Sequence, residues 1–338
     1  MGKLIITADD YGACQFIDDG IERAIDGGHI NTVSAFVTHK KSKDSIKRLL
    51  KKRESNLKGG KNAFNIGLHF SITSGFSLQK KDTTLTNIEK DGDFYFFEAK
   101  NYPFNSIDEN DLYNEVIAQL TKLDEMLDEV LIDHITVHHG ITYLDSDLYE
   151  VFIKAIADYK GPVGKNKYEK PISMRSPQSW FRAKDVPNCC YDPETGDKML
   201  LSEIITEGFE LRYWKKLKET TNTKMQWKKA RAAEFNIKST DYLVDVIYDQ
   251  CCSEGLNCLF KVLASQDITA EFMFHLGYQT GADDVAEWDF ENKVEGEHGI
   301  NKKYFYRRMW EELKTIEDIN LASQISKFKI QKISYSDL

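Results

Sequence analysis

Two adjacent carboxylates near the start of the chain, Asp9 and Asp10, are placed where a hydrolase could use them. They follow the apolar run at residues 4–8 and precede Gly12, which allows a sharp turn. In a parallel β/α architecture the carboxyl ends of strands face the ligand, so this pair would lie at the reactive edge of the sheet. Asp is also common as the cap of a helix that follows a strand, and this structural role competes with the catalytic one.

Histidines end three further apolar runs, although the chain has only 8 histidines in all. The first run ends at His69, the second at His138 and His139, and the third at His275. A single histidine often satisfies only a local hydrogen bond. Four strand ends that carry Asp, His, His and His indicate more than local hydrogen bonding. One carboxylate and two imidazoles can bind a catalytic divalent ion and leave some of its coordination positions open.

Apolar patterning predicts how these residues are positioned. Strand patterns alternate with helical spacing, which indicates βα units around a parallel sheet. The predicted strands cover residues 3–8, 31–38, 63–69, 131–138, 171–176, 270–275 and 328–335, and the predicted helices cover 16–27, 109–128, 147–159 and 302–317. We therefore expect an α/β fold, an irregular or incomplete TIM-like (β/α) barrel formed by residues 1–338 as a single domain.

Two segments interrupt this alternation. Residues 71–107 contain glycines and several aromatic residues and predict a long loop or a small hairpin beside His69. Residues from about 180 to 265 predict a helical insertion, with helices at about 204–236 and 240–263. This insertion could serve as a lid over the site or as a dimerisation element.

Composition limits the classes of partner. The chain has 338 residues, with 45 basic and 54 acidic side chains and a net charge of −9, which argues against nucleic acid or an anionic membrane as the main partner. A neutral or cationic sugar fits better, and a homodimer is compatible with the sequence. The start of the sequence lacks a signal-peptide pattern, so a cytoplasmic location is expected. The 6 cysteines, partly in adjacent pairs, are typical of free thiols in a reducing compartment.

The motifs together resemble those of the YdjC-like carbohydrate deacetylases, a family that includes chitooligosaccharide deacetylases. The resemblance rests on four segments: Ala8-Asp9-Asp10-Tyr11-Gly12, Gly67-Leu68-His69-Phe70, residues 134–139 and His275-Leu276-Gly277-Tyr278. This chain departs from the family pattern at three positions. Thr136 stands where the family usually has Asp, Gly140 where it often has His, and Leu276 where it has Pro. The missing carboxylate at Thr136 puts in question how a neighbouring metal-binding histidine is oriented.

The resemblance implies a metal-dependent hydrolase that removes acetyl groups from N-acetylated amino sugars or short oligosaccharides. It implies that Asp10, His69 and His138 bind the divalent ion and that Asp9 is the general base. His275, which arrives from another predicted strand, is the candidate to protonate the departing nitrogen. Spacing alone would allow Asp9 and Asp10 to exchange roles. Magnesium or zinc is expected first, although the same ligands also admit manganese, cobalt or nickel.

Several further residues are candidates for substrate binding. Arg175 ends a predicted strand and could orient the catalytic aspartate, bind substrate or form a surface salt bridge. His139, which points away from His138 if the strand continues, and Tyr278 are also candidates. Aromatic side chains could stack on sugar rings or pack a local core: Phe94 to Phe97, Trp180, Phe181 and Trp214.

Two other functions remain compatible with the sequence. The same metal site could hydrolyse another amide, an ester or a phosphoester. The departures at Thr136, Gly140 and Leu276 also allow a non-catalytic sugar-binding protein whose site has drifted.

Overall fold

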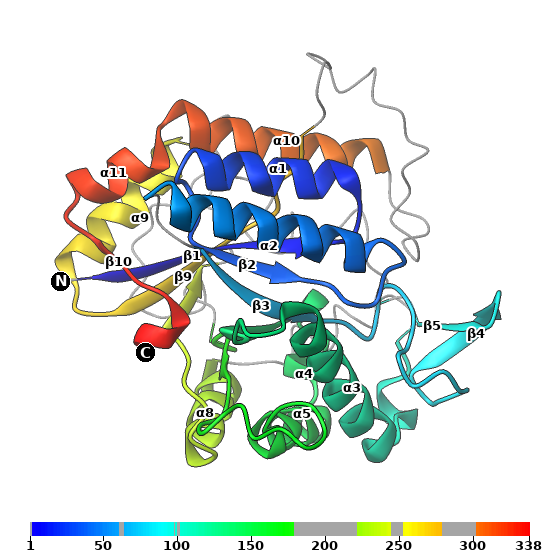
Figure 1. The fold of residues 1–338 in the computed structure, drawn as a ribbon. Coiled ribbons are helices and arrows are strands. Elements are labelled where there is room, and N and C mark those ends of the chain that lie inside the picture. The colour runs from blue at the N-terminus through cyan, green and yellow to red at the C-terminus, as the bar shows by residue number, and fades with distance from the viewer. Residues whose placement is uncertain are drawn as a thin grey trace.

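The structure is a computed structural model that describes residues 2–60, 64–97, 99, 102–178, 222–244, 253–278 and 302–338. Its central feature is a curled parallel sheet with the strand order β7-β6-β3-β2-β1-β9-β8, and β10 pairs with β1 (Figure 1). The strands are β1 (Lys3–Tyr11), β2 (Thr32–Ala35), β3 (Asn65–Phe70), β6 (His134–Val137), β7 (Ser173–Met174), β8 (Tyr242–Val244), β9 (Thr269–Phe274) and β10 (Gln331–Lys332). The expected incomplete TIM-like barrel is therefore confirmed.

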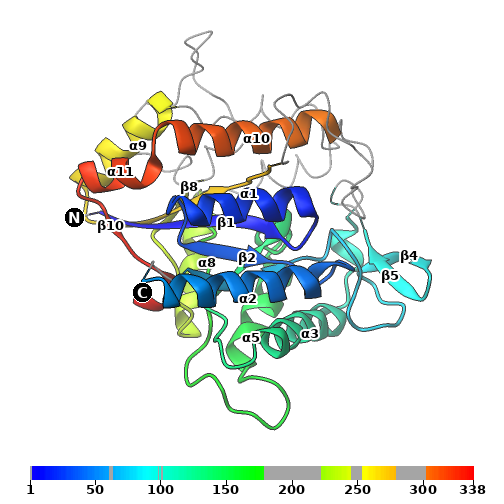
Figure 2. The ribbon, with the colours of Figure 1, turned by 45° about the horizontal axis from the view of Figure 1, so that its top comes forward.

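Helices flank the outside of this curled sheet. They are α1 (Gln15–Asp26), α2 (Ser42–Lys58), α3 (Glu109–Leu127), α4 (Ile141–Leu144), α5 (Ser146–Asp158), α8 (Asn222–Glu234), α9 (Ser253–Ser265), α10 (Lys302–Asp318) and α11 (Leu321–Lys327). Helices α1 and α10 lie side by side in both views, as do α3 and α5 (Figures 1 and 2). No helix in the described ranges has the length and apolar character needed to cross a membrane.

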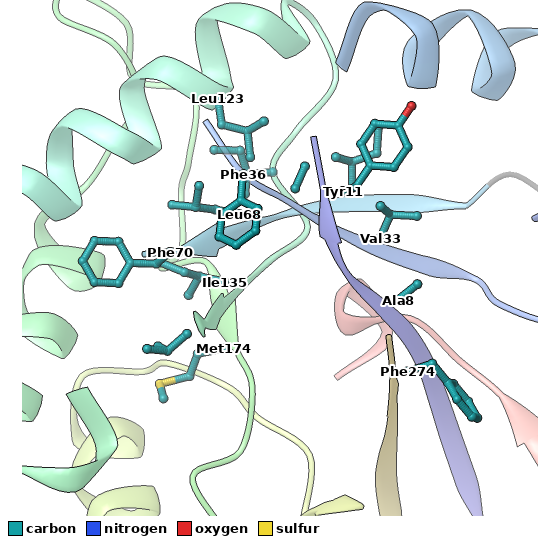
Figure 3. Packing of buried hydrophobic residues seen from close by; sticks show 14 of the residues in the cluster. Ala8, Tyr11, Val33, Phe36, Leu68, Phe70, Leu123, Ile135, Met174 and Phe274 are labelled. Atoms are coloured by element: carbon teal, nitrogen blue, oxygen red, sulfur yellow. The ribbon is translucent and has the colours of Figure 1, made fainter. Parts of the chain in front are cut away.

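The two faces of β1 have different surroundings. Leu4, Ile6 and Ala8 join the large apolar core, part of which is shown in Figure 3. The alternating side chains, including Thr7 and Asp9, face the concave interior of the curl, because successive residues of a strand point to opposite faces. This face of β1 therefore becomes polar toward its carboxyl end, at Thr7 and Asp9, whereas Ile5 near its amino end packs in a small apolar cluster with Ile333 and Tyr335.

The two edges of the curled sheet approach each other. Met174 N–H donates to Lys238 C=O and Leu243 N–H donates to Gln178 C=O, each at 2.8 Å, so the β7 and β8 edges are linked by backbone hydrogen bonds. The chain ends also meet, because Lys3 and Leu4 pair with Gln331 and Lys332 in parallel register. The C-terminal segment therefore lies at the amino end of β1, opposite the end that carries Asp9 and Asp10 (Figure 1).

The hairpin expected within residues 71–107 is present. Strands β4 (Thr86–Lys90) and β5 (Asp93–Phe96) form an antiparallel pair that projects from the sheet in both views (Figures 1 and 2). Within the aromatic group, Phe96 is buried, whereas Phe94 and Tyr95 are half-buried. Phe96 therefore packs the base of the hairpin.

Three local predictions need correction. The single helix expected over 240–263 is wrong, because β8 occupies Tyr242–Val244 beside β9 and α9 begins only at Ser253. Helix α2 was not predicted, since its only large buried apolar residues are Ile46 and Leu49, which is a weak helical pattern. The strands predicted over 31–38, 131–138, 171–176 and 328–335 are shorter in the structure and cover only Thr32–Ala35, His134–Val137, Ser173–Met174 and Gln331–Lys332.

Other predictions lie outside the described residues. Much of the insertion expected at about 180–265 belongs to this group, as do Trp180, Phe181, Trp214 and the adjacent cysteine pairs. Within that segment, α8 falls inside the helix predicted over 204–236.

Candidate metal centre and hydrolytic site

The acidic pair at the end of β1 lies on a distorted piece of strand. The register with β2 shifts between Ala8 and Tyr11, and Asp10 has a φ of 70°, in the left-handed region. In a regular strand Asp9 and Asp10 would face opposite sides, but a bulge redirects side chains. Both carboxylates consequently approach His69: Asp9 Oδ2 lies 4.0 Å from Nδ1, and Asp10 Oδ1 lies 3.0 Å from Nε2.

Three buried side chains converge in the geometry of a metal site. Asp10 Oδ1 lies 3.0 Å from His69 Nε2 and 3.3 Å from His138 Nδ1, and the two nitrogens are 3.1 Å apart. Ligand atoms about 2.1 Å from one ion and at angles of about 90–110° are separated by about 3.0–3.4 Å, so these residues fit a divalent cation. Sequence reasoning expected these same three ligands, and the fold brings them together from the ends of β1, β3 and β6.

His69 is oriented by Thr136, the residue that replaces the carboxylate of the family pattern. Thr136 Oγ1 lies 2.7 Å from His69 Nδ1 and donates to Leu68 C=O at 3.4 Å. The hydroxyl can therefore accept the Nδ1–H, which leaves the lone pair of Nε2 directed at the ligand cluster. The hydroxyl of Thr136, a neutral acceptor, can therefore orient His69 in place of the carboxylate that the family pattern has at this position.

His138 and His139 lie beyond the end of β6, so the alternation expected from a continuing strand does not apply. The strand ends at Val137, and His139 adopts a φ of 55°. Its ring centroid lies 3.8 Å from that of His138, and its Nδ1 lies 3.0 Å from Thr73 Oγ1. His139 therefore packs beside the ligand histidine instead of pointing away from it.

Arg175 and Asp9 form a buried two-pronged ion pair. Arg175 Nη1 donates to Asp9 Oδ2 at 2.5 Å and Nη2 donates to Oδ1 at 2.9 Å. The surface salt bridge considered for Arg175 is wrong, because this side chain is buried inside the curl. Burial acts to raise the pKa of Asp9, but the charge and hydrogen bonds of Arg175, together with the charges of His69 and His275, outweigh it and hold that pKa well below its usual range. The ionised form of Asp9 is therefore favoured by its surroundings.

His275 arrives from β9 on the other side of Asp10. Its Nε2 lies 3.8 Å from Asp10 Oδ2, and its backbone N–H donates to Glu312 Oε2 at 2.8 Å. Burial lowers the pKa of His275, although the charges of Asp10 and Asp9 act in the opposite direction. The structure thus adds an imidazole at the rim of the three-residue cluster.

Tyr278 contacts helix α1 rather than the ligand cluster. Its N–H donates to Phe16 C=O at 2.9 Å, and its ring lies 4.4 Å from the guanidinium carbon of Arg23. These contacts hold the loop that follows His275 against α1. Tyr278 is therefore close to His275 in sequence, but its side chain packs on α1 and not on the ligand cluster.

Two buried residues of the site were missed by sequence reasoning. His39 follows β2, with Nε2 3.1 Å from Ser74 Oγ and its ring 4.6 Å from that of Phe36, which also contacts His69 and His138. Burial lowers the pKa of His39 to about 3, so its imidazole is neutral. The sequence signal that could have identified His39 is its position shortly after the mainly apolar run at residues 33–37. The second residue is Glu271, the one charged side chain of β9 (Thr269–Phe274), which contacts Arg175.

Known proteins show the same combination of residues and fold. The family model described as YdjC-like protein matches residues 3–314. This chain belongs to the YdjC-like protein family. A carbohydrate deacetylase from Danio rerio is 26% identical over 162 residues, which are 46% of this YdjC-like chain and 47% of that protein. The chain thus aligns with about half the length of that relative.

A solved structure extends the likeness over the whole fold of this YdjC-like protein. It is that of an Enterococcus faecalis protein described provisionally as a cellobiose-phosphate cleavage protein. The TM-score is 0.62, with 15% identity, and the superposition covers 99% of this chain and 98% of the other. At this identity the likeness concerns the fold alone.

Proposed function

We propose that this YdjC-like chain is a metal-dependent hydrolase that removes acetyl groups from N-acetylated amino sugars or their short oligomers. The observation that carries the proposal is the buried convergence of Asp10, His69 and His138. Family membership and the partial match to a carbohydrate deacetylase support the choice of bond and substrate class.

The donor set suits a catalytic ion. One carboxylate and two imidazoles, all from the carboxyl ends of parallel strands, would leave coordination positions open to water and substrate. A divalent ion bound there would polarise the acetyl carbonyl and lower the pKa of a water molecule. Magnesium and zinc are the ions we would test first, because both are compatible with oxygen and imidazole ligands.

Asp9 is the proposed general base. Arg175 holds its carboxylate in one orientation, and the low pKa of Asp9 keeps it ready to accept a proton. A carboxylate is a weak base, so Asp9 would take a proton only from a water whose own pKa has been lowered. Activation of the water would therefore require both the ion and Asp9.

His275 is the proposed acid for the departing nitrogen. It approaches Asp10 from β9, on the side opposite β3 and β6 in the strand order. Protonation of the nitrogen is needed because an amide anion is a poor leaving group. His139 and the half-buried aromatics of the β4–β5 hairpin are proposed to contact the sugar.

Acetate release from the metal-stripped protein tests this function. N-acetylglucosamine, its oligomers, an aryl ester and a phosphoester would each be supplied with single divalent ions. We expect acetate release that depends on the ion, disappears in Asp10→Asn together with ion binding, and disappears in Asp9→Asn while ion binding remains. Asp26→Asn is the matched control, since it neutralises an exposed carboxylate of α1.

Two outcomes would point to the alternatives. Turnover of the ester or phosphoester alone would keep the metal site and change the bond. Sugar binding without hydrolysis by any ion would favour a binding protein whose catalytic site has drifted.

A further inference from the structure

The guanidinium of Arg175 is shared between two carboxylates. Besides its two bonds to Asp9, Nε donates to Glu271 Oε1 at 3.0 Å and Nη2 donates to the same oxygen at 2.7 Å. Nη2 therefore bridges Asp9 and Glu271. Because the guanidinium is rigid and planar, an acceptor on one edge fixes the direction of the other edge.

Glu271 is itself held by the last residues of the chain. Tyr335 O–H donates to Glu271 Oε2, the oxygen that does not contact Arg175. Both side chains are buried, and the four bonds from Arg175 to the carboxylates of Asp9 and Glu271 are charge-assisted. A continuous hydrogen-bonded path thus runs from Tyr335 through Glu271 and Arg175 to Asp9.

Tyr335 is anchored independently of this path. Its ring stacks on His134 at a centroid distance of 4.5 Å and an interplanar angle of 8°. His134 Nε2 lies 3.0 Å from Ser34 Oγ, and a Cβ added to Gly67 would meet the His134 ring at 2.3 Å. The glycine of β3 makes room for the histidine on which the tyrosine rests.

We propose that Glu271 and Tyr335 are positioning residues of the hydrolytic site, which fix Asp9 through Arg175. The inference rests on the proposed function for Asp9 but concerns residues that no strand-end motif includes. It makes the C-terminal segment, at the opposite end of β1, part of the active site. Without the phenol, the Glu271 carboxylate would gain rotational freedom, and the Arg175 fork would no longer be held in one direction.

Tyr335→Phe is the most selective test, since it removes the hydroxyl and keeps the stacked ring. Tyr159→Phe is the matched control, because Tyr159 is also buried and donates to a buried carboxylate, Asp124, at 3.1 Å. For Tyr335→Phe we expect kcat to fall by about tenfold to a hundredfold, as for a modest misplacement of a reacting group, with KM and the Kd of the ion nearly unchanged. Tyr159→Phe should leave all three values unchanged.

A second readout does not depend on turnover. The Arg175 Nε–H signal of nitrogen-15-labelled protein, assigned by its loss in Arg175→Lys, should exchange about tenfold faster with solvent in Tyr335→Phe and Glu271→Gln, because protection requires a closed hydrogen bond. Tyr159→Phe should not change it.

The two proposals fail in different ways. If the unmodified protein hydrolyses none of the sugars, the proposed function is wrong, and the exchange rate of Arg175 Nε–H alone decides the positioning. If that rate and kcat in Tyr335→Phe equal those of the unmodified protein, or if Tyr159→Phe lowers kcat equally, the positioning is refuted.

Discussion

The hydroxyl of Thr136 lies 2.7 Å from Nδ1 of His69, on the side of the imidazole away from Asp10. A histidine that binds a metal through one nitrogen usually donates from the other to a carboxylate, a carbonyl or water. In this YdjC-like chain the acceptor is a hydroxyl whose own proton is directed to Leu68 C=O. A neutral hydroxyl thus contacts His69 at the position where the family motif usually has a carboxylate.

Replacing Thr136 by Val should weaken metal binding. The isosteric side chain removes the acceptor for His69 Nδ1–H, so the other tautomer, with its proton on Nε2, becomes competitive. We expect the Kd of the ion to rise about tenfold to a hundredfold, the usual effect of losing such a partner. Calorimetric titration of the metal-stripped protein measures it, and Thr136→Ser, which keeps the hydroxyl, should bind nearly normally. Equal Kd values for the Val and Ser variants would show that the hydroxyl does not orient His69.

Removing the imidazole of His275 should affect poor leaving groups most. We expect His275→Ala to lower kcat for an acetylated amino sugar by about 10²–10⁴-fold, the usual contribution of a positioned acid. Turnover of an aryl acetate, whose phenolate departs without a proton, should change much less. A similar loss on both substrates would instead assign His275 to substrate or ion binding.

Gly277→Ala should destabilise the loop that carries His275. A Cβ at this position would lie 1.9 Å from Cε1 of Phe16, which is closer than any real contact. We expect the free energy of unfolding to fall by about 1–3 kcal/mol, as for other overpacked sites. Denaturant unfolding measures this loss. Adding Phe16→Ala should remove the clash, so the double variant should be more stable than the sum of the two single changes predicts.

Ionisation of the Asp18 carboxyl should lower the free energy of unfolding as pH rises. Its carboxylate accepts from Gly12 N–H at 2.6 Å and from Ser45 O–H at 2.5 Å, but burial raises its pKa from 3.8 to about 6. A raised pKa means that the folded state binds the proton more tightly than the unfolded state. The contribution of Asp18 to stability is therefore present below about pH 4 and is lost as pH rises through about 6.

Asp18→Asn should remove this dependence. We expect the variant to gain roughly 1–3 kcal/mol relative to the unmodified protein between pH 4 and pH 7, since one pKa unit corresponds to 1.36 kcal/mol. Denaturant unfolding across this range measures the difference. Asp26→Asn, on the same helix but more exposed, should run parallel to the unmodified protein. A constant difference between Asp18→Asn and the unmodified protein at all pH values would contradict the assignment.

Sequence patterns anticipated the ligand cluster because of a general property of parallel sheets. Asp10, His69 and His138 each end a strand run, and the carboxyl ends of parallel strands lie at one edge. The same logic would have selected His39, which also follows a strand run. It could not select Glu271, because a charge within an apolar run has no partner until distant strands are brought together.

The sequence by itself determined the incomplete barrel and the edge at which the acidic pair and the histidines gather. These follow from local periodicity and from the few ways in which βα units can pack. The choice of Asp10, His69 and His138 as the three candidate ligands came from the family resemblance, since spacing alone left Asp9 and Asp10 interchangeable. Only the tertiary structure decided that a bulge turns Asp9 and Asp10 to the same side and that Thr136 selects the nitrogen of His69. It also decided that Tyr335, more than 300 residues from Asp9, completes the support of that carboxylate. These features depend on contacts between residues distant in sequence and on side-chain directions, neither of which has a periodic signature.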